Sequence, residues 1–407
     1  MSIIVQKFGG SSVADAEKIH RAARRAIKAK LAGHQVVMVV SAMGKTTDKL
    51  VALANEVNPN PPKREMDMLL TTGEQVSISL MAMAIAAAGY EAISFTGGQI
   101  GMLTDSSHTK ARIRSIDAER IYKELDAGRV VIVAGFQGIT EEGALTTLGR
   151  GGSDTTAVAL AAVLKDSICE IYTDVDGIYS TDPRIVPQAR KMVEINYDEM
   201  LELASLGAKV MHSRSIEFGK KYNVPIHVRS SLTDSEGTMI VAQTQGMEDI
   251  VVRGVTLKKD LARVVLMGVP NTPGIASQIF ARVAQHQVVV DDIIQNIVEH
   301  ASEANIGFTT SGTDAKEAEV ICKQLCKDLG IRTFEVDNKL AKVSIVGIGM
   351  KTHTGVAAKM FNALAEAHIN IQNITTSEIV ISCIVDEKQG EKAVQVLHST
   401  FGLDKAE

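Results

Sequence analysis

Residues 149–154, with the sequence GRGGSD, carry the strongest indication of chemistry in the chain. They combine three glycines with an arginine, a serine and an aspartate directly before an alanine-rich helical stretch. Glycines let the backbone approach a ligand closely, and the Arg150 guanidinium offers two parallel N–H donors to a carboxylate or a phosphoryl group. Ser153 or Asp154 could simply cap the helix, but a cap requires neither three glycines nor an arginine. The segment therefore predicts a site for an anionic ligand.

A second glycine turn, KFGGSSV at residues 7–13, follows the first predicted strand. Lys7 stands at the strand end, and a helix predicted over Val13 to Ala32 is expected to open at Ser11 and Ser12. The free N–H groups and the dipole of a helix start favour negative charge. The turn predicts a phosphate cradle with a lysine beside it, although a glycine pair at a strand-to-helix turn also occurs for steric reasons alone.

Two further segments place polar side chains near the ends of predicted elements. Residues 41–50, SAMGKTTDKL, end a buried strand. Ligands bind at such strand ends in an open α/β sheet, so Ser41 and Thr47 are candidate contacts. Glu74 is expected at the front of an apolar helix, where it is either a first-turn carboxylate favoured by the helix dipole or the acceptor for a substrate ammonium.

Residues 172–184, YTDVDGIYSTDPR, follow another predicted strand and are rich in acidic and turn-forming residues. A calcium-binding EF-hand would need a glutamate where this segment has Asp182 followed by Pro183, so a turn-rich ligand loop is the better prediction. Lys209 lies further on, after a glycine, and taken alone is typical of a solvated surface lysine.

The elements that must position these residues alternate between short β-branched runs and longer helical patterns from residue 2 to about 241. This alternation predicts a mainly parallel sheet covered by helices on both faces. Helices are expected over Ile116 to Ala127 and after Asp154, and residues 138–149 are expected to form a hairpin outside the sheet.

The remaining chain contains an internal repeat, since the segment from Ala262 aligns with the segment from Ala341 when two residues are inserted in the second loop. A strand, a glycine loop, a helix and a second strand recur, which predicts two copies of one small module.

The composition favours a soluble, cytoplasmic protein that acts on small charged metabolites. The charged fraction is 22% and the net charge is −5, so neither nucleic acid nor an acidic membrane is indicated as a partner. No segment reaches about 18 uninterrupted apolar residues, and the N-terminus lacks a signal-peptide pattern. The four cysteines are expected to be buried, reduced thiols.

Taken together, eight segments closely resemble the aspartate kinases of the amino-acid kinase family: KFGGSS, SAMG, TTGEQVS, TDSSH, AGFQG, TTLGRGGSDTTA, YTDVDGIYSTDPR and SLGAKVMHSRS. They occur in order over residues 2–241, and the tail resembles the paired ACT modules of the same enzymes. The resemblance implies an α/β amino-acid kinase fold followed by two ferredoxin-like α+β modules. The implied domains are 1–245 for catalysis, 246–335 for ACT module 1 and 336–407 for ACT module 2.

The resemblance implies transfer of the ATP γ-phosphoryl group to the side-chain carboxylate of L-aspartate, the entry to lysine, threonine and methionine synthesis. That carboxylate is already ionised at neutral pH, so the site needs positive charge and N–H donors rather than a strong base. Mg²⁺ should arrive with ATP, and no dedicated metal ligands are expected. The implied catalytic residues are Lys7 and Asp154. The implied aspartate contacts are Ser41, Thr47, Glu74, Arg150, Gly151, Gly152 and Ser153. The implied nucleotide contacts are Lys7, Phe8, Gly9, Gly10, Ser11, Thr173, Asp174, Tyr179, Asp182, Arg184 and Lys209.

The ACT resemblance implies feedback by lysine, threonine or both, bound at a module interface. The implied effector contacts are Asn271, Thr272, Gly274, Ile275, Ala276, Asp291 and Gln295. Val289 stands where the family commonly has asparagine and Thr354 where proline is common, which leaves the effector and the number of sites open. A homo-oligomer through the ACT modules is expected, and a separate regulatory subunit could start near Met247, as in some relatives.

Three alternatives stay open at this point. The chain could be another enzyme of the same fold that phosphorylates glutamate, acetylglutamate or a nucleoside monophosphate. It could be a non-catalytic amino-acid sensor, against which the intact set of Lys7, Glu74, Arg150 and Asp154 argues. The ACT pair could also be a dimerising scaffold that binds no effector.

Overall fold

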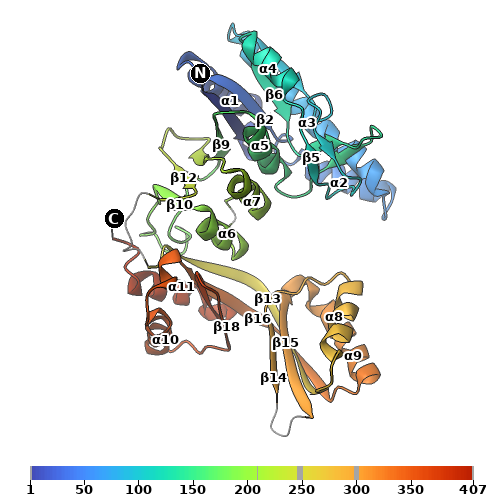
Figure 1. Cartoon of the computed structure of the whole chain (residues 1–407), viewed down its shortest axis with the longest axis vertical. Helices are drawn as coiled ribbons and strands as arrows, with labels where there is room; N and C mark the ends of the chain where they lie inside the picture. The colour runs from blue at the N-terminus through green and yellow to red at the C-terminus, as the bar shows by residue number, and fades with distance from the viewer. Residues whose placement is uncertain (1, 209, 245–250, 298–301, 406–407) are drawn as a thin grey trace. The chain divides into compact units, whose positions relative to one another are not determined.

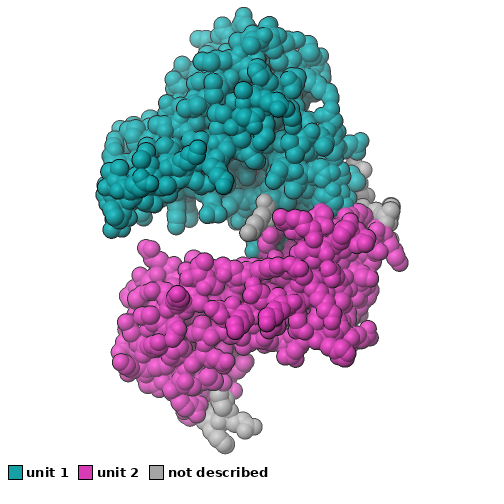
Figure 2. All heavy atoms as spheres, turned by 180° about the vertical axis from the view of Figure 1, so that it is seen from behind, with its two compact units in different colours: residues 1–179, 191–205, 209–246 teal, residues 180–190, 206–208, 247–407 magenta. Residues whose placement is uncertain are grey.

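The computed structural model describes residues 2–208, 210–244, 251–297 and 302–405. The chain forms two compact units, shown in teal and magenta in Figure 2. Unit 1 contains residues 1–179, 191–205 and 209–246, and unit 2 contains residues 180–190, 206–208 and 247–407. Each unit is described by itself below.

Among the described residues of unit 1, eight strands form one sheet in the order β10-β12-β11-β9-β1-β2-β6-β3 (Figure 1). Neighbouring strands run parallel except for the antiparallel pair β11 and β12. Every residue from Val36 to Val40 is buried, as expected for a strand covered on both faces. The predicted mainly parallel sheet is confirmed. The strands are β1 (Ile3–Phe8), β2 (Gln35–Val40), β3 (Ala92–Phe95), β6 (Val130–Ala134), β9 (Ser167–Thr173), β10 (Glu194–Asn196), β11 (Ile226–Ser230) and β12 (Thr238–Val241).

The helices of unit 1 bury apolar side chains against this sheet. Ile19 of α1 and Ile78 of α3 share a core with Met38 of β2 and Ile132 of β6, and α5 packs on β1, β2 and β9. The helices are α1 (Ala16–Leu31), α2 (Thr46–Val57), α3 (Lys63–Ala87), α4 (Glu119–Asp126), α5 (Gly152–Val163), α6 (Tyr197–Ser205) and α7 (Ser213–Tyr222).

Helix α3 is, by length and composition, the one helix in the described residues that could span a membrane. In this fold it is a packed helix of unit 1. Its buried residues include apolar side chains that join the core, such as Ile78 and Met81, and two carboxylates, Asp67 and Glu74. A core helix passes the same test of length and composition, so the finding does not indicate a membrane protein.

The first helix does not open at Ser11 and Ser12, so that prediction is wrong. Residues Gly10–Val13 form a separate 3₁₀ turn, and α1 begins at Ala16 because the side chain of Asp15 caps it by accepting the backbone N–H of Lys18.

The hairpin predicted at residues 138–149 is confirmed. Strands β7 (Gln137–Ile139) and β8 (Leu145–Thr147) pair antiparallel. With β4 (Leu103–Thr104) and β5 (Ile113–Ser115) they form a second sheet in the order β5-β4-β7-β8. Strand β8 leads directly into residues 149–154.

Unit 2 holds an antiparallel sheet in the order β14-β15-β13-β16-β18-β17. The predicted repeat is confirmed, since strand, glycine loop, helix and strand recur from β13 and from β16. Its elements are β13 (Gly254–Pro270), α8 (Ile275–Gln285), β14 (Ile293–Ile297), β15 (Glu303–Ser311), α9 (Ala315–Leu329), β16 (Thr333–Val346), α10 (Val356–Glu366), β17 (Asn373–Thr376), β18 (Val380–Asp386) and α11 (Gly390–Thr400).

The second module of unit 2 takes part of its core from the start of β13 and the residues just before it. Val252 and Val255 pack with Val343 and Met360, whereas the later part of β13 packs with α8 and α9. Residues 180–190 join the same second-module core through Val186.

Two hydrogen bonds fix residues 180–190 within unit 2. The carbonyl of Ser180 accepts the backbone N–H of Val255 at 2.8 Å. The Ser180 hydroxyl lies 2.9 Å from Nε2 of His398, a histidine that is buried in α11. This segment is therefore an integral part of the second-module fold.

Candidate active site

Three parallel strands of unit 1 end side by side, and their carboxyl ends carry the predicted turns. The backbone N–H of Ser41, after β2, donates to the carbonyl of Phe8 at the end of β1 (3.1 Å), and the N–H of Gly135, after β6, donates to the carbonyl of Val40 at 3.0 Å. The site predicted from sequence is therefore assembled where ligands bind in open α/β sheets.

The turn at residues 9–10 packs so closely on the turn after β2 that it requires glycine. The N–H of Gly44 donates to the carbonyl of Gly10 at 2.9 Å. A Cβ atom at Gly10 would lie 2.7 Å from the carbonyl oxygen of Ala42, so the glycine is needed for close backbone approach.

Lys7 and Asp154 form the charged centre of the site. Nζ of Lys7, on β1, lies 2.6 Å from Oδ1 of Asp154, in the first turn of α5, and both side chains are only 12% exposed. The two glycine turns that the sequence singled out, far apart in the chain, therefore meet at this ion pair.

The glycine-rich turn before α5 uses backbone angles that favour glycine. Gly149 has φ 78° and Gly151 has φ 68°. The capping position of α5 is Gly151 and the helix begins at Gly152. The interpretation of Ser153 or Asp154 as a cap is therefore wrong, and so is the expected helix start after Asp154. Arg150 is exposed at the tip of the turn.

Arg214 supports this turn, a role that the sequence analysis missed. Its guanidinium donates to the carbonyl of Leu148 at 2.8 Å and to the carbonyl of Ala111 at 2.9 Å. Burial lowers the pKa of Arg214 from its usual value. His212 of the same segment lies against Gly151. The motif SLGAKVMHSRS contains both residues, but nothing in its spacing indicates which backbone they contact.

Glu74 lies well inside α3 rather than at a helix front, so the prediction of a first-turn carboxylate is wrong. Its Oε1 accepts the N–H of Ala42 at 3.2 Å. Its Oε2 is buried and has no hydrogen-bond partner within the described part of the chain. Burial raises the pKa of Glu74 to about 7. The carboxyl group thus faces the turn after β2 with one free oxygen.

Replacing Glu74 with glutamine is expected to remove a pH-dependent loss of stability. In the unfolded chain the Glu74 carboxyl has its ordinary pKa of 4.5, and in the folded, ligand-free protein its pKa is about 7. Between these values the folded state binds more protons, so this residue's contribution to stability is complete below pH 4.5 and is lost as pH rises through about 7. The loss is of the order of 3 kcal/mol.

Urea unfolding of the ligand-free protein at pH 5 and pH 8 measures this effect. The difference in unfolding free energy between Glu74→Gln and the parent should grow in favour of the variant at pH 8. An equal difference at both pH values contradicts the assignment.

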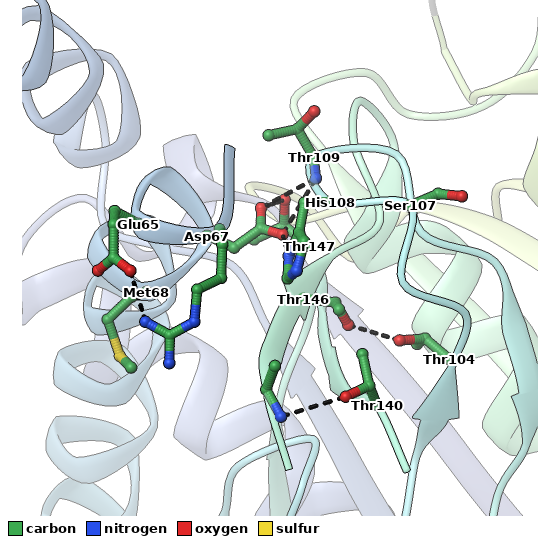
Figure 3. A network of polar contacts seen from close by, with 12 residues as sticks. Glu65, Asp67, Met68, Thr104, Ser107, His108, Thr109, Thr140, Thr146 and Thr147 are labelled. Carbon is green, nitrogen blue, oxygen red and sulfur yellow. Dashed lines mark hydrogen bonds and ion pairs between the residues drawn. The ribbon is translucent and has the colours of Figure 1, made fainter. Parts of the chain in front are cut away.

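A second buried carboxylate in α3, Asp67, was also missed. Figure 3 shows it pointing from the helix toward the segment with His108 and Thr109 and toward Thr147 at the end of β8. The sequence does not indicate this role, because the residues around Asp67 are equally typical of a solvent-exposed aspartate in the first turn of a helix.

The residues predicted to contact the nucleotide do not all lie in the same part of the structure. Thr173 ends β9, and its hydroxyl donates to Asp174 at 3.0 Å, while the hydroxyl of Tyr179 donates to Asp176 at 2.8 Å. Asp182 and Arg184 form an ion pair with each other within residues 180–190 of unit 2. Lys209 lies outside the described residues.

The predicted effector residues lie around the first glycine loop of unit 2. Gly274 has φ 91° and caps α8, which begins with Ile275 and Ala276. Asn271 donates its N–H to the carbonyl of Ser302 at 2.9 Å, and Thr272 is exposed.

Two further effector residues precede or lie on β14. Asp291 contacts Nζ of both Lys258 and Lys342 at 3.0 Å. Gln295 is exposed on the edge strand β14. Met247 lies outside the described residues.

The described residues contain no group of three or more His, Cys, Asp or Glu side chains able to hold a metal ion. Cys322 and Cys326 both lie on α9, with Cys322 fully buried, and burial raises the pKa of both thiols.

A parallel α/β unit with a lysine–aspartate pair between two glycine turns, joined to a repeated module, defines the class of amino acid kinases with regulatory domains. Residues 2–230 match the amino acid kinase family, and residues 263–330 and 343–401 match the ACT domain.

Full-length relatives narrow this class. The aspartokinase of Bacillus sp. strain MGA3 is 52% identical over 403 residues, which cover 99% of this chain and 98% of that protein. The aspartokinase of Pseudomonas aeruginosa is 50% identical over 406 residues, with the same coverage of 99% and 98%. The chain belongs to the aspartokinases of the amino acid kinase family.

A solved structure shares the whole architecture. E. coli aspartokinase III, solved with aspartate and ADP and also with lysine and aspartate, has a TM-score of 0.80 at 27% identity, covering 98% of this chain and 99% of that one.

Proposed function

We propose that this chain transfers the γ-phosphoryl group of ATP to the side-chain carboxylate of L-aspartate. A carboxylate oxygen of aspartate attacks the γ-phosphorus, the bond from phosphorus to the bridging oxygen of ADP breaks, and 4-phospho-L-aspartate and ADP leave. Neither reactant needs a strong base, because the attacking carboxylate is already ionised. The protein must bring two anions together and neutralise their charge.

The observation that carries this proposal is the free buried oxygen of Glu74 beside the turn after β2. A buried carboxylate oxygen without a donor is costly, and an ammonium group of a ligand would supply one. An amino acid with one ammonium and two carboxylates has charges opposite to those of the site. The ammonium suits the Glu74 oxygen, and the carboxylates suit the two cations Arg150 and Lys7. The E. coli relative solved with aspartate and ADP supports aspartate as the acceptor and an adenine nucleotide as the second ligand.

In this proposal each charged residue binds a substrate group of opposite charge. Arg150 binds the α-carboxylate of aspartate through its two parallel donors, and Glu74 binds the ammonium. Lys7, held by Asp154, neutralises negative charge that develops on the transferring phosphoryl group. Ser41 and Thr47 orient the acceptor.

The nucleotide has its own contacts. Phe8, Gly9, Gly10 and Ser11 approach its phosphates with Lys7, and Thr173, Asp174 and Tyr179 contact it from the end of β9. The resemblance to aspartate kinases also implies nucleotide contacts by Asp182, Arg184 and Lys209. Magnesium bound to ATP supplies further charge neutralisation.

Trapping of the acyl phosphate tests the reaction. Purified protein with Mg·ATP and hydroxylamine should form aspartyl hydroxamate in amounts equal to the ADP produced. Glutamate, N-acetylglutamate and a nucleoside monophosphate serve as competing acceptors in parallel assays. Turnover of one of these in place of aspartate would overturn the proposal, and so would ATP hydrolysis that does not depend on an acceptor.

Feedback through the ACT modules is part of the same proposal. The effector is lysine, threonine or both, bound at the loop of residues 271–276 with Asp291 and Gln295, and the E. coli relative has been solved with lysine. Assays with each amino acid singly and jointly identify it. Analytical ultracentrifugation of the full chain tests the proposed homo-oligomer and any separate regulatory subunit that starts near Met247.

A further inference from the structure

Asp67 is buried at 0% exposure, and three donors surround its carboxylate. The N–H of Thr109 donates to both oxygens at 3.1 and 3.0 Å, and the hydroxyl of Thr147 donates to Oδ1 at 2.6 Å. Nδ1 of His108 lies 2.8 Å from Oδ2 (Figure 3). A buried carboxylate with this many donors fixes the groups that donate to it.

One of these donors is held in an unfavourable backbone conformation. Thr109 has φ 68°, a left-handed angle that is rare for a β-branched residue. Such angles persist where the surroundings hold them in place, and they concentrate at functional sites. The two hydrogen bonds to Asp67 hold the N–H of Thr109 itself.

The donors lie on both sides of the glycine-rich turn. Thr147 ends β8, so it stands three residues before Arg150 in the chain. The carbonyl of Thr109 would lie 3.0 Å from a Cβ atom at Gly149. Asp67 therefore fixes the strand that enters the turn and also the segment against which Gly149 rests.

Asp67 and Glu74 are seven positions apart, about two turns along one face of α3. Glu74 contacts the turn after β2, whereas Asp67 contacts Thr147 at the end of the strand that leads into the turn with Arg150. One helix thus contacts both the turn after β2 and the strand that enters the glycine-rich turn.

We propose that Asp67, through Thr147 and Thr109, is a positioning residue that holds Arg150 at the correct distance from Glu74 for the acceptor amino acid. This inference rests on the proposed function, because it needs Arg150 to bind the acceptor carboxylate. It does not place Asp67 in contact with substrate. Loss of the Asp67 contacts raises KM for aspartate and leaves KM for ATP close to its original value.

Two neighbouring threonines of β8 provide a matched test. Thr147→Val removes one hydroxyl that bonds Asp67, whereas Thr146→Val removes an equally buried hydroxyl that bonds Thr104 at 2.6 Å instead. Both variants lose one hydrogen bond in the same strand. Thr147→Val should raise KM for aspartate about tenfold, with KM for ATP within about twofold, and Thr146→Val should change neither by more than about twofold.

Asp67→Asn should show the same selective rise in KM for aspartate. Adding Thr109→Gly to it should restore part of the loss, because glycine takes a positive φ without help. Thermal unfolding of each variant is measured in parallel. If Asp67 has a merely structural role, KM for aspartate should rise in proportion to the loss of melting temperature, and Thr146→Val and Thr147→Val should behave alike. That result overturns the inference.

A double-mutant cycle with Arg150→Ala separates this inference from the proposed function. If Arg150→Ala alone leaves KM for aspartate unchanged, the assignment of Arg150 is wrong and the positioning role of Asp67 falls with it, whereas hydroxamate formation still decides the proposed reaction. If Arg150→Ala raises KM and Thr147→Val adds its full effect on top, the function stands and the positioning role is overturned. The expected result is that Thr147→Val adds less than about twofold once Arg150 is absent.

Discussion

Replacing Lys7 with alanine is expected to lower kcat by roughly a thousandfold while the chain stays folded. The 2.6 Å contact of Lys7 with Asp154 places a cation between the two glycine turns, and Lys7 is the one cationic side chain of β1. The sheet should persist, because β1 is paired on both sides, with β2 and β9. Hydroxamate formation measures turnover, and circular dichroism measures folding.

Lys28→Ala is the control for this experiment. Lys28 is 79% exposed on α1 and forms a long ion pair of 3.7 Å with Asp234, so its loss should leave kcat unchanged. Retained turnover in Lys7→Ala would contradict the assignment of Lys7. A fall of similar size in both variants would show that the assay responds to general destabilisation.

Replacing Gly151 with alanine should lower kcat/KM for aspartate by about a hundredfold or more. Its φ of 68° is unfavourable for alanine, and the new Cβ would lie 2.2 Å from Cβ of His212. Either His212 or the turn must move, and the turn carries Arg150 on one side and Asp154 on the other. Steady-state kinetics with varied aspartate measures the loss.

Gly143→Ala separates backbone strain from collision. Gly143 has φ 85°, and a Cβ there would meet nothing within 4 Å among the described residues. Only the strain, about 1 kcal/mol, should appear as a lower melting temperature, with kinetics unchanged. If Gly143→Ala and Gly151→Ala lose equal activity, the loss in Gly151→Ala does not come from the steric contact with His212.

The sequence predicted the sheet, the hairpin and the repeat, because these depend on local patterns of apolar residues and turn residues. Only the resemblance to aspartate kinases implied that Lys7 and Asp154 share one site, because the two glycine turns are far apart in the chain. Helix starts were less accurate. Asp15, a few residues past the expected opening, caps α1 in place of Ser11 and Ser12, and α5 begins at Gly152 without a polar cap residue.

The residues that support the site could not be predicted from sequence patterns, and the reason is physical. Asp67, Glu74 and Arg214 act through backbone groups that are distant in the chain, and a backbone N–H or carbonyl has the same chemistry at every position. Glu74 looks like a first-turn carboxylate only if the helix is assumed to begin near it. Contacts of this kind become visible when the strand ends are assembled.

Residues 180–190 bear on whether a shorter polypeptide beginning near residue 247 can fold by itself. Such a polypeptide would retain Val252 and Val255 but would lack Val186, and His398 would lose the hydroxyl of Ser180. The hydrophobic core that α10 and α11 cover would then lose one of its buried side chains. An independently translated regulatory piece is therefore expected to unfold at a lower temperature than the same modules in the full chain.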